Sequence, residues 1–174
     1  MQMEQTLPSL KYTGYAIALQ EVPDEISLVI SISGCPFSCK GCHSPYLQQD
    51  TGKLLKGDLP EILNNPYYVH GITCICFMGG DQNPYELEEL LAYVKAATPY
   101  KTCVYSGVND LHRFGTERMF QDHLIDYLKI GEYDPSRGGL DKPTTNQRMF
   151  KIEYSDKQNP RLHDITDKFR TYVC

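Results

Sequence analysis

Residues 26–43 read ISLVISISGCPFSCKGCH, an apolar run that ends in three closely spaced cysteines. The first eight residues are rich in isoleucine and valine, which favour strands because branched side chains pack well on a pleated surface. Gly34 ends this predicted strand and leads directly into the cysteines. The cysteine group is therefore expected at the C-terminal end of a strand.

The rest of the chain alternates strand-like and helix-like stretches. Strands are predicted at residues 72–78, 101–106, 125–130 and 147–153, and helical stretches at residues 58–64, 84–97 and 117–123. Asn83 and Pro84 form the expected start of the longest helix, because asparagine caps helices and proline suits the first turn. The strand at residues 72–78 is apolar throughout, which is typical of a sheet covered on both faces.

Strands that alternate with helices predict a parallel sheet with right-handed crossovers. A complete (β/α)₈ barrel takes about 250 residues, whereas this chain has 174. The expected fold class is therefore α/β, in the form of a partial (β/α) barrel with a mainly parallel sheet. With no linker-like tract and no internal repeat, residues 1–174 are expected to form a single domain.

Composition and charge exclude several classes of function. The net charge is −5 and no cluster of lysine and arginine is present, so nucleic acid is not expected as a partner. No apolar run approaches the ~20 residues of a membrane span, and the N-terminus lacks the pattern of a secretory signal. A soluble, cytoplasmic protein is expected, and its seven cysteines are then expected to be reduced.

Three of the cysteines follow the spacing Cys35-x3-Cys39-x2-Cys42. Three thiolates on one loop suit soft ligation of iron or zinc better than a disulfide. Held by three ligands, a four-iron cluster would keep one iron open for catalysis, as catalytic metal sites require. The alternative is a zinc knot completed by His43 or by a distant cysteine. The strand cysteines Cys74, Cys76 and Cys103 are instead interpreted as core thiols.

A second motif, Gly79-Gly80-Asp81, lies between the strand at residues 72–78 and the helix at residues 84–97. Glycines here let the backbone present N–H and C=O groups to a ligand, although an ordinary strand-to-helix turn also favours glycine. Together with the cysteine loop one strand earlier, this motif resembles the radical S-adenosylmethionine superfamily. In that superfamily a strand, a Cys-x3-Cys-x2-Cys loop and a Gly-Gly-Glu-like motif follow one another.

The resemblance implies the cofactors and their ligands. Cys35, Cys39 and Cys42 would hold a [4Fe-4S] cluster, and Gly79, Gly80 and Asp81 would contact the amino group of S-adenosyl-L-methionine. Electron transfer from the cluster would then cleave this cofactor to methionine and a 5′-deoxyadenosyl radical. The expected fold becomes a partial barrel of the radical S-adenosylmethionine type.

Two departures from the superfamily pattern narrow the resemblance. Gly41 replaces the usual aromatic residue before the third cysteine, and Asp81 replaces the usual glutamate. Both look like the activating enzymes of anaerobic ribonucleotide reductases, and residues 129–133 and 144–148 are similar to segments of that family. The implied partners are the reductase catalytic subunit, which receives a glycyl radical, and a low-potential electron donor such as flavodoxin or ferredoxin.

Two alternatives to this function remain. One is a radical enzyme that acts on another glycyl-radical enzyme or on a small molecule. The other is a non-catalytic, zinc-binding interaction module, which would be colourless.

Several further residues have two interpretations. Lys129 would bind the cofactor carboxylate or reach water from a strand end, and Ser106 would bind a ribose hydroxyl or cap a turn. His43 would contact the cluster sulfur or adenine, or it would be a simple loop residue. The sequence leaves the roles of Asn146, Gln147 and Arg148, and of Cys174, undecided.

Overall fold

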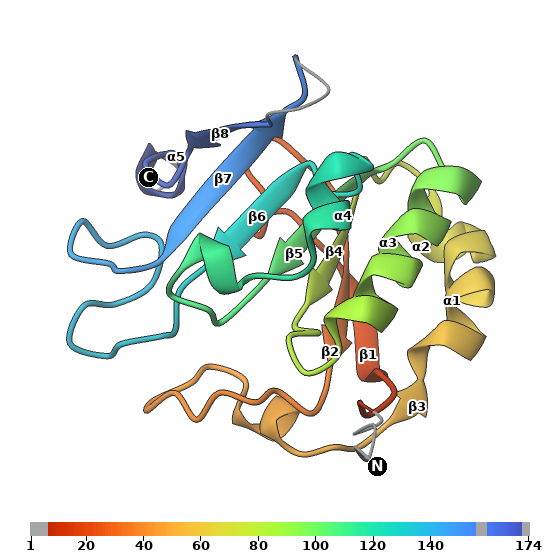
Figure 1. Ribbon diagram of the computed structural model, residues 1–174, viewed down its shortest axis with the longest axis horizontal. Coiled ribbons are helices and arrows are strands. Elements are labelled where there is room, and N and C mark those ends of the chain that lie inside the picture. The colour runs from red at the N-terminus through yellow and green to blue at the C-terminus, as the bar shows by residue number, and fades with distance from the viewer. Residues whose placement is uncertain (1–6, 156–159, 172–174) are drawn as a thin grey trace, which may run out of the picture.

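A computed structural model describes residues 7–155 and 160–171 of the chain. These residues form an open, mixed eight-stranded sheet in the order β3-β1-β2-β4-β5-β6-β7-β8, with helices packed against it (Figure 1). The strands are β1 (Lys11–Ala18), β2 (Ser27–Ile32), β3 (Lys53–Leu54), β4 (Cys74–Met78), β5 (Lys101–Tyr105), β6 (Tyr127–Ile130), β7 (Arg148–Glu153) and β8 (Arg161–Asp164). The α-helices are α1 (Leu55–Asn64), α2 (Pro66–Val69), α3 (Pro84–Ala97), α4 (Glu117–Gln121) and α5 (Lys168–Thr171).

The centre of the sheet is parallel and both of its sides are antiparallel. Strands β2, β4, β5 and β6 pair in parallel, whereas β1 and β3 on one side and β7 and β8 on the other pair antiparallel. The α/β class is confirmed, but the expectation of a mainly parallel sheet is wrong outside this centre. A parallel connection needs a dozen or more residues, and the link between β1 and β2 is shorter; residues 131–147, although long enough, contain no crossover helix.

One face of the sheet packs against the helices. Ile75 and Phe77 of β4 are fully buried in a core that also contains apolar side chains of α1, α3 and α4. The start of α3 is as expected, because the Asn83 side chain accepts a hydrogen bond from the Glu86 backbone N–H at 3.1 Å. The leucines and the valine at helical spacing along α3 are buried against the sheet, which confirms the predicted helix.

The opposite face carries the strand cysteines. Cys74, Cys76 and Cys103 are fully buried there beside Tyr127, and partly buried side chains of the C-terminal segment pack against them. The interpretation of these three residues as core thiols agrees with this burial. Because β4 is buried on both faces, the expectation of a sheet covered on both sides is also confirmed.

Among the residues that the structure describes, no helix is long and apolar enough to cross a membrane. Three strands, β1, β3 and β8, were not expected from the sequence. The parallel arrangement of β2, β4, β5 and β6 brings the loops after these strands to one edge of the sheet. Both motifs of the sequence lie in these loops.

Candidate functional site

The cysteine loop follows β2 at the carboxyl edge of the sheet. Cys35, Cys39 and Cys42 are free thiols of intermediate exposure. Gly41 lies in the left-handed region at φ 72°, and the Cys42 backbone N–H donates to the Cys39 carbonyl at 3.2 Å. The Ser44 backbone N–H donates to the Cys42 sulfur at 3.4 Å. The loop is thus a compact series of turns that holds three thiols.

The Cys35 thiol lies near Asp81 of the second motif. Burial raises the pKa of Cys35, and the negative charges of Asp81, Cys39 and Cys42 raise it further. A positive ion or cluster at this place would reverse the effect, because it would favour the thiolate forms. The Gln82 side chain, next to Asp81, donates to the Ser33 carbonyl at 2.6 Å, so the structure brings the cysteine loop and Asp81 together although 38 residues lie between Cys42 and Asp81 in the sequence.

Two neighbouring loops hold the cysteine loop in place. A β-carbon at Gly107, which follows β5, would lie 2.3 Å from the Phe37 ring carbon Cδ2, so only glycine leaves room for this ring. On the other side, a β-carbon at Gly41 would lie 3.5 Å from the Tyr133 ring, and the His43 and Tyr133 ring centroids are 4.8 Å apart. The cysteine loop therefore lies between the loop after β5 and the long loop after β6.

The Gly79-Gly80-Asp81 turn follows β4 and depends on its glycines. Gly79 and Gly80 have φ values of 106° and 113°, a conformation that side chains other than glycine rarely adopt. A β-carbon at Gly80 would also lie 3.0 Å from the Leu87 side chain of α3. The turn thereby allows close packing of α3 and carries Asp81 to the site.

The Asp81 carboxylate is held by the loop after β5. The Ser106 hydroxyl donates to Oδ1 at 2.5 Å, and the Gly107 backbone N–H donates to Oδ2 at 3.2 Å. Burial raises the pKa of Asp81, and these two hydrogen bonds oppose the rise. The Ser106 hydroxyl also accepts from the Val108 N–H at 3.1 Å, which agrees with the turn-capping interpretation of Ser106.

Lys129 of β6 is buried below the same loops. Its side chain donates to the Gly131 carbonyl at 2.6 Å and to the Ser106 carbonyl at 3.5 Å, and the residue is 8% exposed. The interpretation of Lys129 as a strand-end residue that reaches water is therefore wrong. Burial lowers the pKa of Lys129 to about 8, although the charges of Cys39 and Asp81 oppose this shift.

The segment at residues 144–148 ends the long loop after β6 and is hydrogen-bonded to the first residues of that loop. The Asn146 amide donates to the Glu132 carbonyl at 2.9 Å, and the Gln147 amide donates to the Gly131 carbonyl at 3.2 Å. The Arg148 guanidinium donates to the Thr145 carbonyl at 2.9 Å. These contacts define structural roles for three residues that the sequence left undecided, whereas Cys174 lies outside the described residues.

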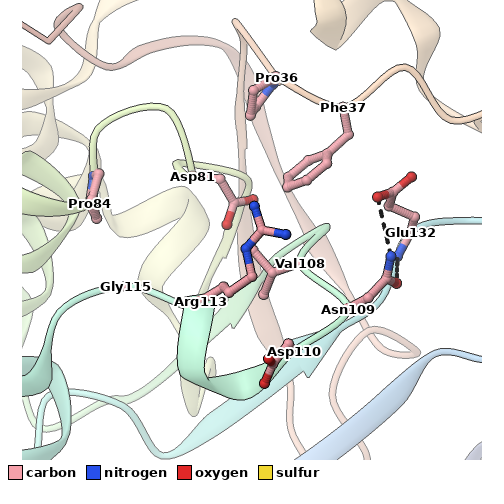
Figure 2. A pocket seen from close by; sticks show the side chains of 10 residues that line it. All are labelled: Pro36, Phe37, Asp81, Pro84, Val108, Asn109, Asp110, Arg113, Gly115 and Glu132. Carbon is pink, nitrogen blue, oxygen red and sulfur yellow. Dashed lines mark hydrogen bonds between the residues drawn. The ribbon is translucent and has the colours of Figure 1, made fainter.

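A cavity of about 430 Å³ opens beside the two motifs (Figure 2). Its volume lies within the ordinary range of small-molecule sites. The lining residues come from the loops after β2, β4, β5 and β6 and from the start of α3; they are Pro36, Phe37, Asp81, Pro84, Val108, Asn109, Asp110, Arg113, Gly115 and Glu132. Asp81 is the one expected site residue in this lining.

Sequence reasoning did not identify Phe37, Asn109, Arg113 and Glu132 as parts of the site. Phe37 could have been found, because it lies between two motif cysteines. Asn109 and Arg113 follow β5, the third parallel strand along the chain. Their position after its carboxyl end is the only feature of the sequence that indicates a place in the site. The pairing of the Asn109 amide with Glu132 at 3.2 Å depends on the tertiary structure.

The donor set determines which metal group the loop suits. Within residues 7–155 and 160–171, no three His, Cys, Asp or Glu side chains are arranged to hold a single metal ion. Three thiols on one loop nevertheless fit an iron–sulfur cluster, for which cysteine thiolates are the usual ligands. Cys35, Cys39 and Cys42 are the residues that could hold it.

An α/β sheet with this thiol-bearing loop at its carboxyl edge is consistent with the class of iron–sulfur proteins. Comparison with family models gives a match to the 4Fe-4S single cluster domain over residues 26–153, well over half of the chain. The chain therefore belongs to the 4Fe-4S single cluster domain family. No curated protein and no solved structure matches the chain.

The match has one direct consequence for function. Membership of this family supports binding of a [4Fe-4S] cluster and is compatible with a redox enzyme. The matched range contains the cysteine loop, the Gly79-Gly80-Asp81 turn and Lys129. Every expected site residue thus lies inside the part of the chain that the family model covers.

Proposed function

We propose that this protein is a radical S-adenosylmethionine enzyme that installs the glycyl radical of an anaerobic ribonucleotide reductase. The observation that carries the proposal is the meeting of two motifs at one sheet edge. Cys35 and Asp81 follow different strands, yet the Gln82 side chain next to Asp81 donates to the Ser33 carbonyl at the start of the cysteine loop, and a cavity of about 430 Å³ lies beside them. In a member of a [4Fe-4S] family, this arrangement suits a cluster next to a small cofactor.

In this proposal Cys35, Cys39 and Cys42 hold the cluster, and Gly79, Gly80 and Asp81 contact S-adenosylmethionine. When bound and reduced, the cluster would supply the electron that splits a carbon–sulfur bond of the cofactor and yields a 5′-deoxyadenosyl radical. The contribution of the chain is to position Asp81 through Ser106 and Gly107 and to exclude water with Phe37.

The proposed architecture is a partial (β/α) barrel of the radical S-adenosylmethionine type. Its four central strands are parallel, and α1, α3 and α4 pack on one face as the outer layer of a barrel would. In parallel barrels, active sites lie at the carboxyl ends of the strands. The cysteine loop, the glycine turn and the cavity all lie at that edge.

The proposed partner is the catalytic subunit of the reductase, with reducing electrons from a donor such as flavodoxin or ferredoxin in the cytoplasm. This part rests on the similarity of residues 129–133 and 144–148 to the activating enzymes. In the structure these two segments contact each other, because the side chains of Asn146 and Gln147 donate to the carbonyls of Glu132 and Gly131. They form the base of the long loop that borders the cysteine loop.

The test is anaerobic reconstitution with iron and sulfide, reduction with dithionite, and measurement of 5′-deoxyadenosine from S-adenosylmethionine. Addition of the cognate anaerobic reductase should give a glycyl doublet in electron paramagnetic resonance. Cleavage without this doublet would reject the proposed partner and leave another glycyl-radical enzyme or a small molecule as substrate. A colourless protein that contains zinc would reject the radical enzyme altogether.

A matched pair of variants tests the ligand assignment. Cys39→Ala should lose the cluster absorbance and the cleavage activity, because three thiolates are the whole proposed ligand set. Cys103→Ala is the control, since Cys103 is fully buried on the sheet face away from α1, α3 and α4. Cleavage retained in Cys39→Ala would contradict the assignment.

A further inference from the structure

The Gln82 side chain joins the two loops that carry the motifs of the site. Its amide Nε2 donates to the Ser33 backbone carbonyl at 2.6 Å, across 49 residues of sequence. Ser33 is fully buried and lies two residues before Cys35, and Gln82 follows Asp81 directly. One hydrogen bond therefore connects the start of the cysteine loop to the end of the Gly79-Gly80-Asp81 turn.

The two loops approach each other closely around this bond. A β-carbon at Gly34, which has a φ of 77°, would lie 3.2 Å from the Gln82 Nε2 atom. A β-carbon at Gly79 would lie 3.2 Å from the Ile32 carbonyl oxygen. Glycine therefore allows both loops to come near each other, and the Gln82 side chain spans the space that remains between them.

The other amide atom of Gln82 indicates that this residue is not there for stability. Its Oε1 is buried and has no hydrogen-bond partner among the described residues. An unsatisfied buried acceptor destabilises the folded state, so it offsets the gain from the bond to Ser33. An apolar side chain of the same length should therefore fold about as well. Stability that is given up at one residue is typical of functional positions.

Each loop is also held by contacts of its own. In the cysteine loop, the Gly34 backbone N–H donates to the Gln49 carbonyl at 3.1 Å, and the Cys35 backbone N–H donates to the Leu47 carbonyl at 2.9 Å. The Asp81 carboxylate is held by the loop after β5. Loss of the Gln82 amide should therefore leave both loops formed and change the position of one relative to the other.

We infer that Gln82 is a positioning residue, which sets the separation between the cysteine loop and the Gly79-Gly80-Asp81 turn. The inference rests on the proposed function, under which the cysteine loop holds a [4Fe-4S] cluster and the turn contacts S-adenosylmethionine. Gln82 then acts through Ser33 to place the cluster at the distance from the cofactor that electron transfer needs. A displacement of about 1 Å at a reacting centre can lower the rate about 100-fold.

The first part of the test compares Gln82→Met with the wild type as full-length apoprotein, because methionine keeps the length of the side chain and loses the donor. Amide hydrogen exchange followed by NMR should be about 2- to 10-fold faster at Gly34 and Cys35, the factor expected for one lost hydrogen bond. The melting temperature should change by less than about 3 °C, because the unsatisfied Oε1 is lost together with the bond. Neither measurement needs the cluster or the cofactor.

The second part measures cleavage of S-adenosylmethionine by the reconstituted protein in excess dithionite. In Gln82→Met, kcat per cluster should fall about 10- to 100-fold, whereas KM should stay within about 3-fold and the cluster content should not change, because Asp81 and the cysteines keep their own contacts. Gln82→Lys should recover part of kcat, since its ammonium group can donate to the same carbonyl.

Tyr100→Phe is the matched control for these measurements. It also removes a side-chain hydrogen bond to a backbone carbonyl, that of Val69 at 3.2 Å. Tyr100 directly precedes β5, so it lies at the end of the parallel strands opposite the cysteine loop. Its kcat should equal that of the wild type. If Gln82→Met does not fold, Gln82→Leu, which also lacks the donor, takes its place.

The outcomes separate the inference from the proposed function. Wild-type kcat in Gln82→Met, or a loss of kcat matched by an equal loss of cluster, would overturn the inference and leave the proposed function standing. A rise in KM at unchanged kcat would likewise overturn it, because Gln82 would then serve cofactor binding. If the wild type does not cleave S-adenosylmethionine, the proposed function fails and the catalytic part of the inference fails with it. The exchange rates of the apoprotein still decide whether Gln82 joins the two loops.

Discussion

The contact between Gly107 and Phe37 allows a quantitative prediction about the cysteine loop. In Gly107→Ala the added methyl carbon would lie 2.3, 2.6 and 2.8 Å from three atoms of the Phe37 ring. Carbon atoms pack at about 3.5–4.0 Å, so the ring must move by more than about 1 Å. Because Phe37 lies between Cys35 and Cys39, this movement displaces the loop that carries the thiols.

The expected cost depends on how far the Phe37 ring can move, and this ring is half-buried and borders the cavity, so the low end of the range for overpacking is expected. Overpacking a well-packed site costs about 1–3 kcal/mol, and a protein of this size loses about 2–4 °C of melting temperature per kcal/mol. The backbone N–H of Gly107 also donates to Asp81, and alanine keeps this donor, so the carboxylate is affected only as far as the backbone shifts. We therefore expect lower thermal stability and less iron and sulfide per chain after reconstitution.

The assay is thermal unfolding of the apoprotein together with iron and sulfide analysis of the reconstituted protein. Gly57→Ala is the matched control, because its β-carbon meets no atom within 4 Å and alanine favours the helix α1 by about 1 kcal/mol. In the double variant Phe37→Ala/Gly107→Ala the clash is absent, so the second substitution should cost nothing further. Wild-type stability and cluster content in Gly107→Ala would refute this account of the loop.

Two other predictions concern buried charges. Burial opposes ionisation of Glu25, yet hydrogen bonds from Lys101 and Tyr127 keep its pKa below the usual range. This stabilisation is present above the unfolded-state pKa and is lost as pH falls, so unfolding measured between about pH 5 and pH 3 should show a decline that Glu25→Gln reduces. In the reconstituted protein, Lys129→Met should make the cluster potential more negative by tens of millivolts in a redox titration, because it removes a positive charge that interacts with three cysteines; an unchanged potential would contradict this.

The elements that the sequence predicted well are those with a strong apolar pattern. Strands β4 and β5 are continuous buried runs, and helix α3 has buried apolar residues at helical spacing, so the sequence of each segment alone was enough to predict it. Strands β1 and β8 are mostly exposed or half-buried and lack that pattern. Their place in the sheet depends on pairing with other strands, so the residues of each strand alone do not predict it.

The candidate site divides in the same way. The three cysteines share one loop, so their spacing alone predicts a common metal group, and the family match supports the cluster. Ser106 and Lys129 were predicted as site residues from their positions at strand ends, but the groups that they contact were not predicted. The hydrogen bond from Ser106 to Asp81 needs β4 and β5 side by side in the observed register.

The amino-acid sequence by itself determined the donor set, the strong strands and helices, and the glycines of the turn after β4, because each depends on neighbouring residues. Only the tertiary structure decided which groups the side chains of the site contact. Gln82 is bound to the Ser33 carbonyl, and Lys129 is bound to two carbonyls below the same loops. These contacts depend on strand order, register and the direction of each side chain, which are set when the sheet assembles.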